Sequence, residues 1–227
     1  MLSKLGNRLF HYRNVLFPIF YLALFIPSKP VFQSNFRAEI IGCIIILGGM
    51  LVRSVTIGLV YIVRGGKNRT IYAEDLVTGG IYSLCRNPMY FGNILLLLGF
   101  AFFANSLLFI SVFFPLFILF YLAIIEAEEA FLENKFGETF AEYRKNVNYL
   151  LPDLRKTKKA FKGQKFKWKK VIYKEHNGFF IFFSGIFLLM FYKGQINLLP
   201  LVFIITGLAF LNGMVKYMKW KHPENET

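Results

Sequence analysis

Cysteine and acidic residues are both scarce in this chain of 227 residues. Only two cysteines occur, Cys43 and Cys85, and they imply no disulfide framework. Asp and Glu number 13 against 27 Lys and Arg, which gives a formal net charge of +14. Such a charge can indicate nucleic-acid binding, but ten of the basic residues fall in one acid-free stretch, 155–174, and 56% of all residues are hydrophobic. This distribution is typical of a membrane protein with a basic loop.

Long apolar runs dominate the chain. Crossing a hydrocarbon core of ~30 Å takes about 20 apolar residues, and runs near this length recur. The first run follows Lys4, Arg8 and Arg13 but is not followed by a small-residue cleavage site, so we interpret it as a spanning helix and not as a signal peptide. The sequence predicts an all-α polytopic membrane bundle of about six transmembrane helices, at Phe10–Pro27, Ala38–Val63, Met89–Asn105, Ser106–Ile125, Gly178–Tyr192 and Leu198–Val215.

Short polar breaks predict that the helices are joined in hairpins. Asn105-Ser106 is the only interruption between the third and fourth segments, and Gly194 and Asn197 mark a turn between the fifth and sixth. Placing both termini in the cytoplasm puts 23 of the 27 Lys and Arg on that side, in agreement with the positive-inside rule. The segment 155–174 then becomes a cytoplasmic linker that we expect to bind anionic membrane lipids. No nucleic-acid partner is expected, and the oligomeric state is not predicted.

Three glutamates cluster where the fourth segment leaves the membrane, namely Glu126, Glu128 and Glu129. They begin a stretch that is predicted to be helical up to Pro152, with a break at Gly137. Carboxylates at membrane depth are costly unless they are paired, so they often mark a functional site, although a solvated helix start is the structural alternative. Arg53 is the other charge within an apolar run, and we expect one of these glutamates to be its partner.

The stretch LCRNPMYFGN, residues 84–93, starts the third segment with polar residues. Pro88 suits the first turn of a helix, and the side chain of Asn87 can serve as its cap. A helix start exposes backbone N–H groups and a positive dipole, which suit an anionic ligand. The glycine pair at 79–80 lets backbone approach a ligand closely, while Tyr82 and Tyr90 offer rings and hydroxyls. A well-capped helix without a ligand is the structural alternative.

The order of these motifs resembles a known superfamily. LVTGGIYSLCRNPMYFGN, a helical hairpin, and then EEAFLENKFGETFAEYRKNVNYLLP are similar to the integral membrane methyltransferases, which include the isoprenylcysteine carboxyl methyltransferases and the phospholipid N-methyltransferases. Their shared signature is Arg-His-Pro-x-Tyr-x-Gly, a hairpin, and Glu-Glu. The match covers roughly residues 53–152, and the hairpin after it looks like an addition found in bacterial members.

The resemblance implies a methyltransferase that uses S-adenosylmethionine on the cytoplasmic side and a lipophilic substrate from the bilayer. It matches Glu128 and Glu129 to the acidic pair that closes the site. We add Arg53 as a third catalytic candidate, because this intramembrane charge could hold a substrate carboxylate. The cofactor-binding positions that it implies are Leu76, Val77, Tyr82, Arg86, Asn87, Pro88, Met89, Tyr90 and Gly92. No metal is expected. We accordingly divide the chain into a methyltransferase core (1–152, with the cofactor site within 74–152), a basic cytoplasmic linker (153–177), and a C-terminal hairpin and tail (178–227).

Two departures from the family pattern leave the methyl acceptor open. Asn87 stands where the family usually has His, and Ile124 stands where the isoprenylcysteine enzymes have an Arg suited to a substrate carboxylate. A prenylcysteine, a phospholipid amine such as phosphatidylethanolamine, an isoprenoid acid or a thiol all remain candidates. The competing classes are a non-catalytic membrane-binding or anchoring protein, a transporter, and a membrane reductase. Of these, the transporter lacks a polar path across the membrane, since Arg53 alone lies deep within it.

Overall fold

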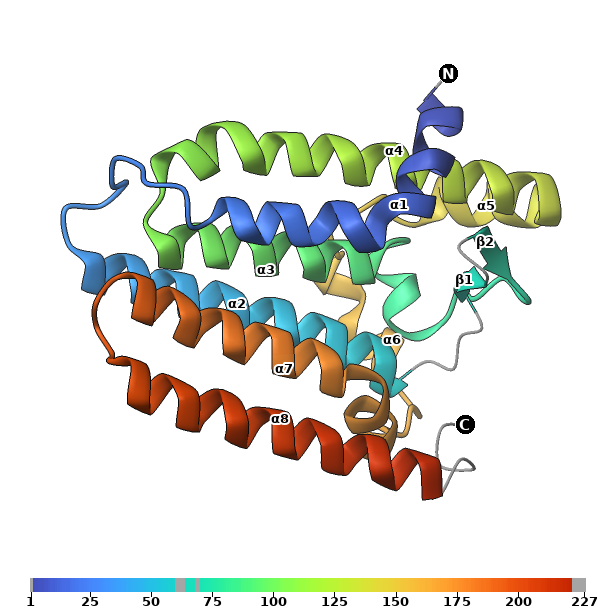
Figure 1. The fold of residues 1–227 in the computed structure, drawn as a ribbon. Coiled ribbons are helices and arrows are strands. Elements are labelled where there is room, and N and C mark those ends of the chain that lie inside the picture. Colours follow the sequence, from blue (N-terminus) through green and yellow to red (C-terminus); the bar gives the residue numbers. More distant parts are fainter. Residues whose placement is uncertain (1, 60–63, 68–69, 222–227) are drawn as a thin grey trace.

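The computed structural model describes residues 2–59, 64–67 and 70–221 (Figure 1). Its architecture is the predicted all-α membrane bundle. The described residues form the helices α1 (Leu2–Ala23), α2 (Asn35–Leu59), α3 (Pro88–Ala104), α4 (Phe114–Phe136), α5 (Glu138–Asn146), α6 (Thr157–Phe161), α7 (Trp168–Tyr192) and α8 (Leu198–Lys221). Three short helical turns, η1 (Gly80–Ser83), η2 (Phe109–Phe113) and η3 (Leu154–Lys156), and a small antiparallel hairpin of β1 (Arg64–Lys67) and β2 (Thr70–Ala73) complete the fold.

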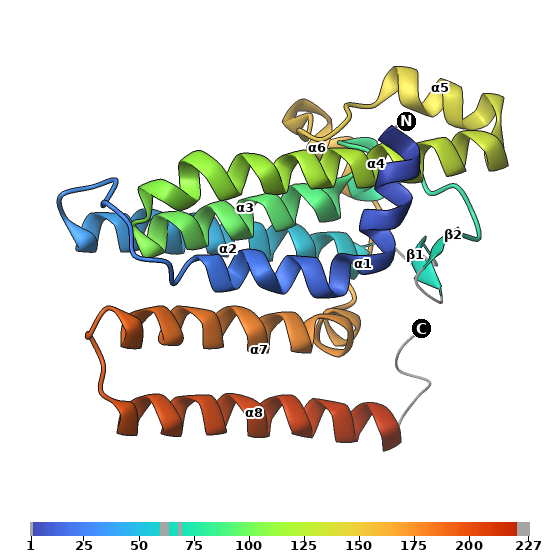
Figure 2. The same cartoon turned by 45° about the horizontal axis from the view of Figure 1, so that its top comes forward.

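Within the described residues, four helical segments are long and apolar enough to cross a membrane: α2, the continuous run 109–136, α7 and α8. Helix α3 is apolar but has only 17 residues. The chain is therefore a multi-pass membrane protein, while the count of six spans stays a prediction. Figure 2 shows α1 to α4 as one group, with α7 and then α8 lying beside it as further layers. The lipid-facing surface is apolar, and α8 is exposed along almost its whole length.

Glycines allow α2 and α3 to pack closely in antiparallel orientation. A Cβ atom added at Gly49 would lie 2.9 Å from the carbonyl oxygen of Gly92, and one added at Gly42 would lie 2.7 Å from that of Gly99. Small residues at such contacts let backbones approach in a membrane, where dispersion contacts drive helix association. The interior beside this contact is filled by large side chains from four helices, including Phe20, Ile46, Leu96, Phe100 and Phe117.

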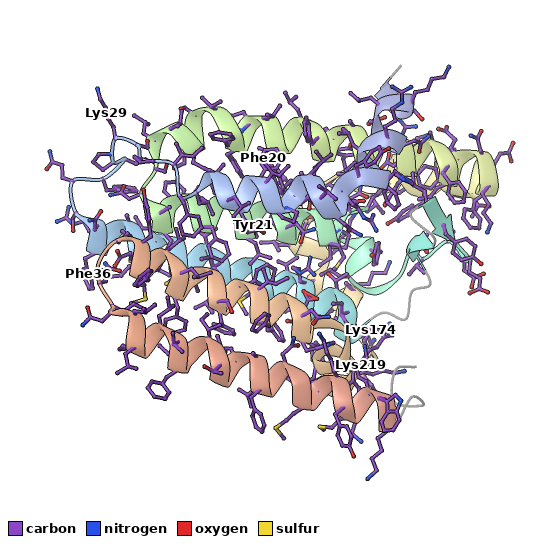
Figure 3. All side chains as sticks on the ribbon, viewed as in Figure 1. Phe20, Tyr21, Lys29, Phe36, Lys174 and Lys219 are labelled. Carbon is purple, nitrogen blue, oxygen red and sulfur yellow. The ribbon has the colours of Figure 1, made fainter. Side chains whose placement is uncertain are left out.

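One end of the bundle, which we call the basic end, carries the start of α1, the end of α8 and most lysines. Figure 3 shows Lys174 and Lys219 at this end and Lys29 and Phe36 at the opposite end. The opposite end is closed by Asn105, which has a left-handed φ of 56° after α3. Its Oδ1 accepts hydrogen bonds from the backbone N–H groups of Val31 and Phe32, both at 2.9 Å. The predicted turn at Asn105 is thereby confirmed.

Several predicted boundaries were wrong. Helix α4 runs on through the glutamates to Phe136, and Gly137 (φ 53°) provides the predicted break, but α5 ends at Asn146 and not near Pro152. Helix α7 begins at Trp168, ten residues before the predicted start of the fifth segment, so the last part of the predicted linker is helical. Val63, the predicted end of the second segment, lies outside the described residues, and the described part of α2 ends at Leu59.

Candidate functional site

Backbone hydrogen bonds bring the two halves of the sequence motif together at the basic end. The N–H of Arg86 donates to the carbonyl of Asn148 at 2.8 Å, and the N–H of Asp153 donates to the carbonyl of Leu84 at 2.9 Å. The loop that leads into α3 is therefore fastened to the segment that follows α5. This arrangement places the start of α3 beside the glutamates of α4. Figure 2 shows the two helices next to each other.

Arg86 is the centre of this connection and is buried. Its Nε donates to Oε1 of Glu129 at 2.9 Å and its Nη2 to Oε2 at 3.2 Å, a bidentate pair. Its Nη1 donates to the carbonyls of Arg144 (2.9 Å) and Val147 (2.7 Å) at the end of α5, where a helix leaves carbonyls without internal partners. The guanidinium is thus directed at groups of the protein itself, and it fixes Glu129 in place.

Asn87 occupies the position before α3, but its side chain does not cap the helix as predicted. Its Nδ2 donates instead to Oε1 of Glu129 at 3.1 Å and to the carbonyl of Tyr149 at 3.0 Å. Both partners are acceptors, so the amide nitrogen must face them. The amide oxygen, Oδ1, is buried and has no hydrogen-bond partner among the described residues. A buried acceptor without a partner is costly, which makes it a candidate contact for a ligand.

Glu128 and Tyr90 meet on the other side of the same helix start. The hydroxyl of Tyr90 donates to Oε1 of Glu128 at 2.6 Å; Glu128 is buried and Tyr90 is half-buried. The ring of Tyr90 packs edge-on against that of Tyr121, with 5.0 Å between centroids. Asn93, one turn further along α3, donates from Nδ2 to the hydroxyl of Tyr121 at 3.0 Å. Four polar groups therefore lie close together near the start of α3: the Glu128 carboxylate, the phenol groups of Tyr90 and Tyr121, and the Asn93 amide.

A cavity of about 250 Å³ opens among these groups. It is lined by Arg13, Tyr82, Arg86, Asn87, Pro88, Met89, Tyr90, Asn93 and Glu128. This volume is slightly below the ~300–1,000 Å³ typical of small-molecule sites. The structure thus brings seven of the sequence-predicted residues to one cavity, although their role in binding stays a prediction.

Sequence reasoning missed two residues of the lining, Arg13 and Asn93. Arg13 was assigned only to the charges that set orientation, but α1 carries it to the cavity, with its guanidinium carbon 3.8 Å from the centroid of the Phe10 ring. No ion pair of Arg13 is seen within the described part of the chain. Asn93 ends the quoted motif, and its position one turn after Tyr90 could have indicated that both face the same side.

Five predicted residues lie away from the cavity lining. Leu76 packs with the cluster between α4 and α5, and Val77 packs near η1 and α6. Gly92 faces α2, where an added Cβ would lie 2.7 Å from Cγ of Arg53. Glu129 is bound to Arg86, and Arg53 is bound to a carboxylate on α7.

The predicted partner of Arg53 was wrong. Its guanidinium binds both carboxylate oxygens of Glu175 on α7, through Nε to Oε1 and through Nη2 to Oε2 at 2.9 Å, and its Nη1 donates to Oδ1 of Asn93. Glu126, Glu128 and Glu129 form no hydrogen bond or ion pair with it among the described contacts. The charge pair lies between α2 and α7, so α7 provides the counter-charge of Arg53.

Burial controls the protonation of two groups next to the site. Cys85 is fully buried, and this burial raises the pKa of its thiol to about 12. Burial also raises the pKa of Tyr149 well above its ordinary value, and the neighbouring Glu126 and Glu129 carboxylates add to the effect. Both groups are therefore neutral around pH 7, and neither supplies a nucleophile there.

Comparison with known proteins matches one segment of the chain to a family. Residues 38–139 match the family described as phospholipid methyltransferase, within the isoprenylcysteine and phospholipid methyltransferase superfamily. The resemblance drawn from the motifs is thereby confirmed for this segment. It includes most of α2, the loop with η1, α3, and α4 with its glutamates.

A similar curated protein is the cobalt-zinc-cadmium resistance protein CzcN of Cupriavidus metallidurans, which is 39% identical over 111 residues, 48% of this chain. The aligned region spans only about half, 49%, of that relative's length. No solved structure matches the chain significantly. Among the described residues, no group of three or more His, Cys, Asp and Glu side chains is placed to hold a metal ion.

Proposed function

We propose that this chain, whose residues 38–139 match the phospholipid methyltransferase family, is an S-adenosylmethionine-dependent membrane methyltransferase that acts on a lipophilic acceptor. The observation that carries the proposal is the cavity at the start of α3, because the family motifs, which lie on either side of a helical hairpin, meet there. We place both termini and this cavity on the cytoplasmic side, where the cofactor is available. The positive-inside distribution of lysine and arginine supports this orientation.

The residues present fit the cofactor. Its carboxylate suits the exposed N–H groups at the start of α3, while its cationic groups suit the Glu128 carboxylate. The buried Oδ1 of Asn87 can accept a hydrogen bond from an amino group. When bound, S-adenosylmethionine supplies an activated methyl group. The described residues would hold it through Tyr82, Asn87, Met89, Tyr90 and Glu128.

The protein's own contribution is alignment and exclusion of water. Methyl transfer requires the acceptor atom to lie in line with the carbon–sulfur bond, so rigid positioning of both partners lowers the barrier. The bond from Tyr90 to Glu128 and the clamp of Arg86 on Glu129 hold the walls of the cavity in fixed rotamers. The apolar helices on either side give a lipophilic acceptor access from the bilayer.

Arg13 favours a carboxylate as the methyl acceptor, as in an isoprenylcysteine carboxyl O-methyltransferase. Arg53 is bound to Glu175 and Arg86 to Glu129, so of these three cations Arg13 is the one that can face an anionic acceptor. A carboxylate needs no general base, because it loses no proton when it is methylated. The second candidate, a phospholipid amine, does need one, and Glu128 is the carboxylate in the cavity.

Binding of S-adenosylhomocysteine to the purified protein, measured by titration calorimetry in detergent, tests the proposal. We expect micromolar binding and a loss of at least tenfold in Glu128→Gln. Glu126→Gln is the matched control, because Glu126 is exposed and lies outside the cavity lining. Absence of binding by the wild-type protein would favour a non-catalytic anchoring role instead.

The acceptor is identified by incubating membranes with labelled S-adenosylmethionine and separating labelled lipid from labelled protein. A base-labile label would indicate a methyl ester, and a base-stable label on phospholipid would indicate N-methylation. Arg13→Gln should raise KM for a carboxylate acceptor at least tenfold. Arg8→Gln, which changes an exposed arginine on the same helix, should leave it unchanged.

A further inference from the structure

A second cavity lies on the far side of η1 from the candidate site. Tyr82 of η1 lines the first cavity, whereas its neighbours Gly80 and Ser83 line the second. The second cavity has a volume of about 390 Å³, and its other walls come from the end of α5 and from the segment around α6. The two cavities share none of their lining residues, so the second can bind a ligand of its own.

Three lysines make the lining of this cavity positively charged. Lys156, Lys159 and Lys162 all line it. Lys156 is partly neutralised, since its Nζ lies 3.7 Å from Oδ2 of Asp153 and donates to the carbonyl of Asn146 at 3.2 Å. No carboxylate of the described chain lies within ion-pair distance of Lys159 or Lys162. These two charges are therefore available to an external anion.

The opposite wall is small and polar. Gly80 has a φ of 59°, a conformation that side chains rarely adopt, and a Cβ atom added at Gly79 would meet no heavy atom within 4 Å. The hydroxyl of Ser83 donates to the carbonyl of Gly80 at 2.7 Å, which leaves its oxygen free to accept. The wall thus leaves open space in front of the lysines, enough for a compact anionic group.

The segments that flank the cavity carry exposed apolar side chains suited to a membrane boundary. The segment after α6 is fastened under the bundle, because the N–H of Lys167 donates to the carbonyl of Gly58 near the end of α2 at 2.8 Å. Trp168, which begins α7, is 70% exposed, and Leu154, which begins η3, is 75% exposed. Tryptophan favours the headgroup region, and exposed leucines beside lysines are typical of surfaces that dip into it.

We propose that the cavity between η1 and α6 binds the phosphate group of an anionic phospholipid from the adjacent leaflet. Lys159 and Lys162 provide the charge, and Leu154 and Trp168 contact the acyl and interfacial region of the same leaflet. The lipid would fasten the basic linker to the membrane next to η1, which also forms one wall of the candidate site. This binding does not depend on the methyltransferase activity.

Native mass spectrometry of the full chain in detergent tests the proposal, with phosphatidylglycerol and phosphatidylcholine as the added lipids. We expect one phosphatidylglycerol molecule to be retained in preference to phosphatidylcholine. The double variant Lys159→Gln, Lys162→Gln should weaken this binding about 25-fold, because each basic residue near an anionic surface contributes roughly a factor of five. Lys159→Arg with Lys162→Arg should keep it.

The matched control is Lys216→Gln with Lys221→Gln, which removes the same charge from exposed positions of α8 at the same end of the bundle. Wild-type binding in this control would support a built site. Equal weakening in both double variants would show general attraction and overturn the proposal. Competition by free glycerol phosphate at the lipid's own concentration would also overturn it, since the site would then take a soluble anion.

Discussion

Arg86 shows how a single side chain organises the site at the scale of the residue. The sequence predicted that it contacts a ligand, but four of its hydrogen bonds go to Glu129 and to the end of α5. A planar guanidinium can serve these acceptors at once, whereas the ammonium of lysine cannot match a carboxylate in the same bidentate way. Arg86 therefore holds the acidic helix against the start of α3.

Replacing Arg86 should destabilise the whole protein. Arg86→Ala leaves the buried Glu129 carboxylate without its main partner, and breaking a buried pair in this way costs about 3–5 kcal/mol. Arg86→Lys should recover only part of the loss. Thermal unfolding in detergent measures both effects.

Arg144→Ala is the matched control for this experiment. Arg144 also approaches Glu129, at 3.9 Å, but its side chain is 46% exposed and its partner Glu133 is exposed as well. Solvent screening limits such pairs to less than ~1 kcal/mol. A loss in Arg144→Ala equal to that in Arg86→Ala would contradict the assigned role.

The sequence did not predict that the neighbouring Glu128 and Glu129 have different partners. The sequence indicated that Glu128 and Glu129 act as a pair, but successive residues of a helix point about 100° apart. Glu128 therefore reaches Tyr90 in the cavity, while Glu129 reaches Arg86 and Asn87. Which glutamate faces which partner depends on the rotation of α4, and this rotation is set by tertiary packing and not by the local sequence.

At the scale of the element, the glycines of α2 and α3 set how closely the two helices pack. Gly49→Ala should destabilise the protein by about 1–3 kcal/mol, because its methyl group would meet the backbone of Gly92, which cannot move without shifting α3. Gly48→Ala is the matched control, since an added Cβ there meets nothing within 4 Å. Thermal unfolding of the two variants should differ. Equal melting temperatures would mean that the helices are not in close contact.

Helix α7 shows why hydropathy alone misplaces an element. Its first ten residues include Lys174, Glu175 and His176, so an apolar window assigns them to a linker. These residues are helical because Glu175 forms an ion pair with Arg53 on α2 and because Val171 and Tyr173 are buried. A contact between residues more than a hundred positions apart decides the boundary, and no local pattern contains it.

Removing one charge of the Arg53–Glu175 ion pair should destabilise the protein more than removing both charges. Glu175→Met leaves the Arg53 guanidinium, whose side chain is only 15% exposed, with a single amide partner, which we expect to cost about 3 kcal/mol. The double variant Arg53→Met, Glu175→Met removes both charges and should be more stable than Glu175→Met alone. A thermal double-mutant cycle measures the coupling. Additive losses would show that the two residues do not interact.

At the scale of the whole molecule, the sequence predicted the class of fold and missed the small parts. Long apolar runs and their polar breaks were sufficient for the helical bundle, because hydrophobic thickness fixes helix length in a membrane. The β1–β2 hairpin was missed, since Arg-Gly-Gly-Lys shows no alternation of apolar residues. The approach of Arg13 to the cavity was also missed, because it depends on the packing of α1 against α4.

The uneven distribution of charge makes orientation testable. Lys29 and Lys219 lie at opposite ends of the bundle (Figure 3), and the proposed topology places Lys219 in the cytoplasm. A background with Cys43→Ser keeps only Cys85, whose buried thiol has a pKa of about 12 and should not react at pH 7. A membrane-impermeant maleimide added to intact cells should then label Lys29→Cys but not Lys219→Cys.

Inverted membrane vesicles should reverse this pattern and provide the control for reactivity at each position. Labelling of both cysteines from one side would require the two ends of the bundle to face the same compartment, which the antiparallel α7–α8 hairpin does not allow. Labelling of Lys219→Cys alone in intact cells would mean that the topology is the reverse of the proposed one. The basic segment 155–174 would then lie outside the cell, and the candidate site would face away from its proposed cofactor, so this one measurement tests the orientation on which the proposed function depends.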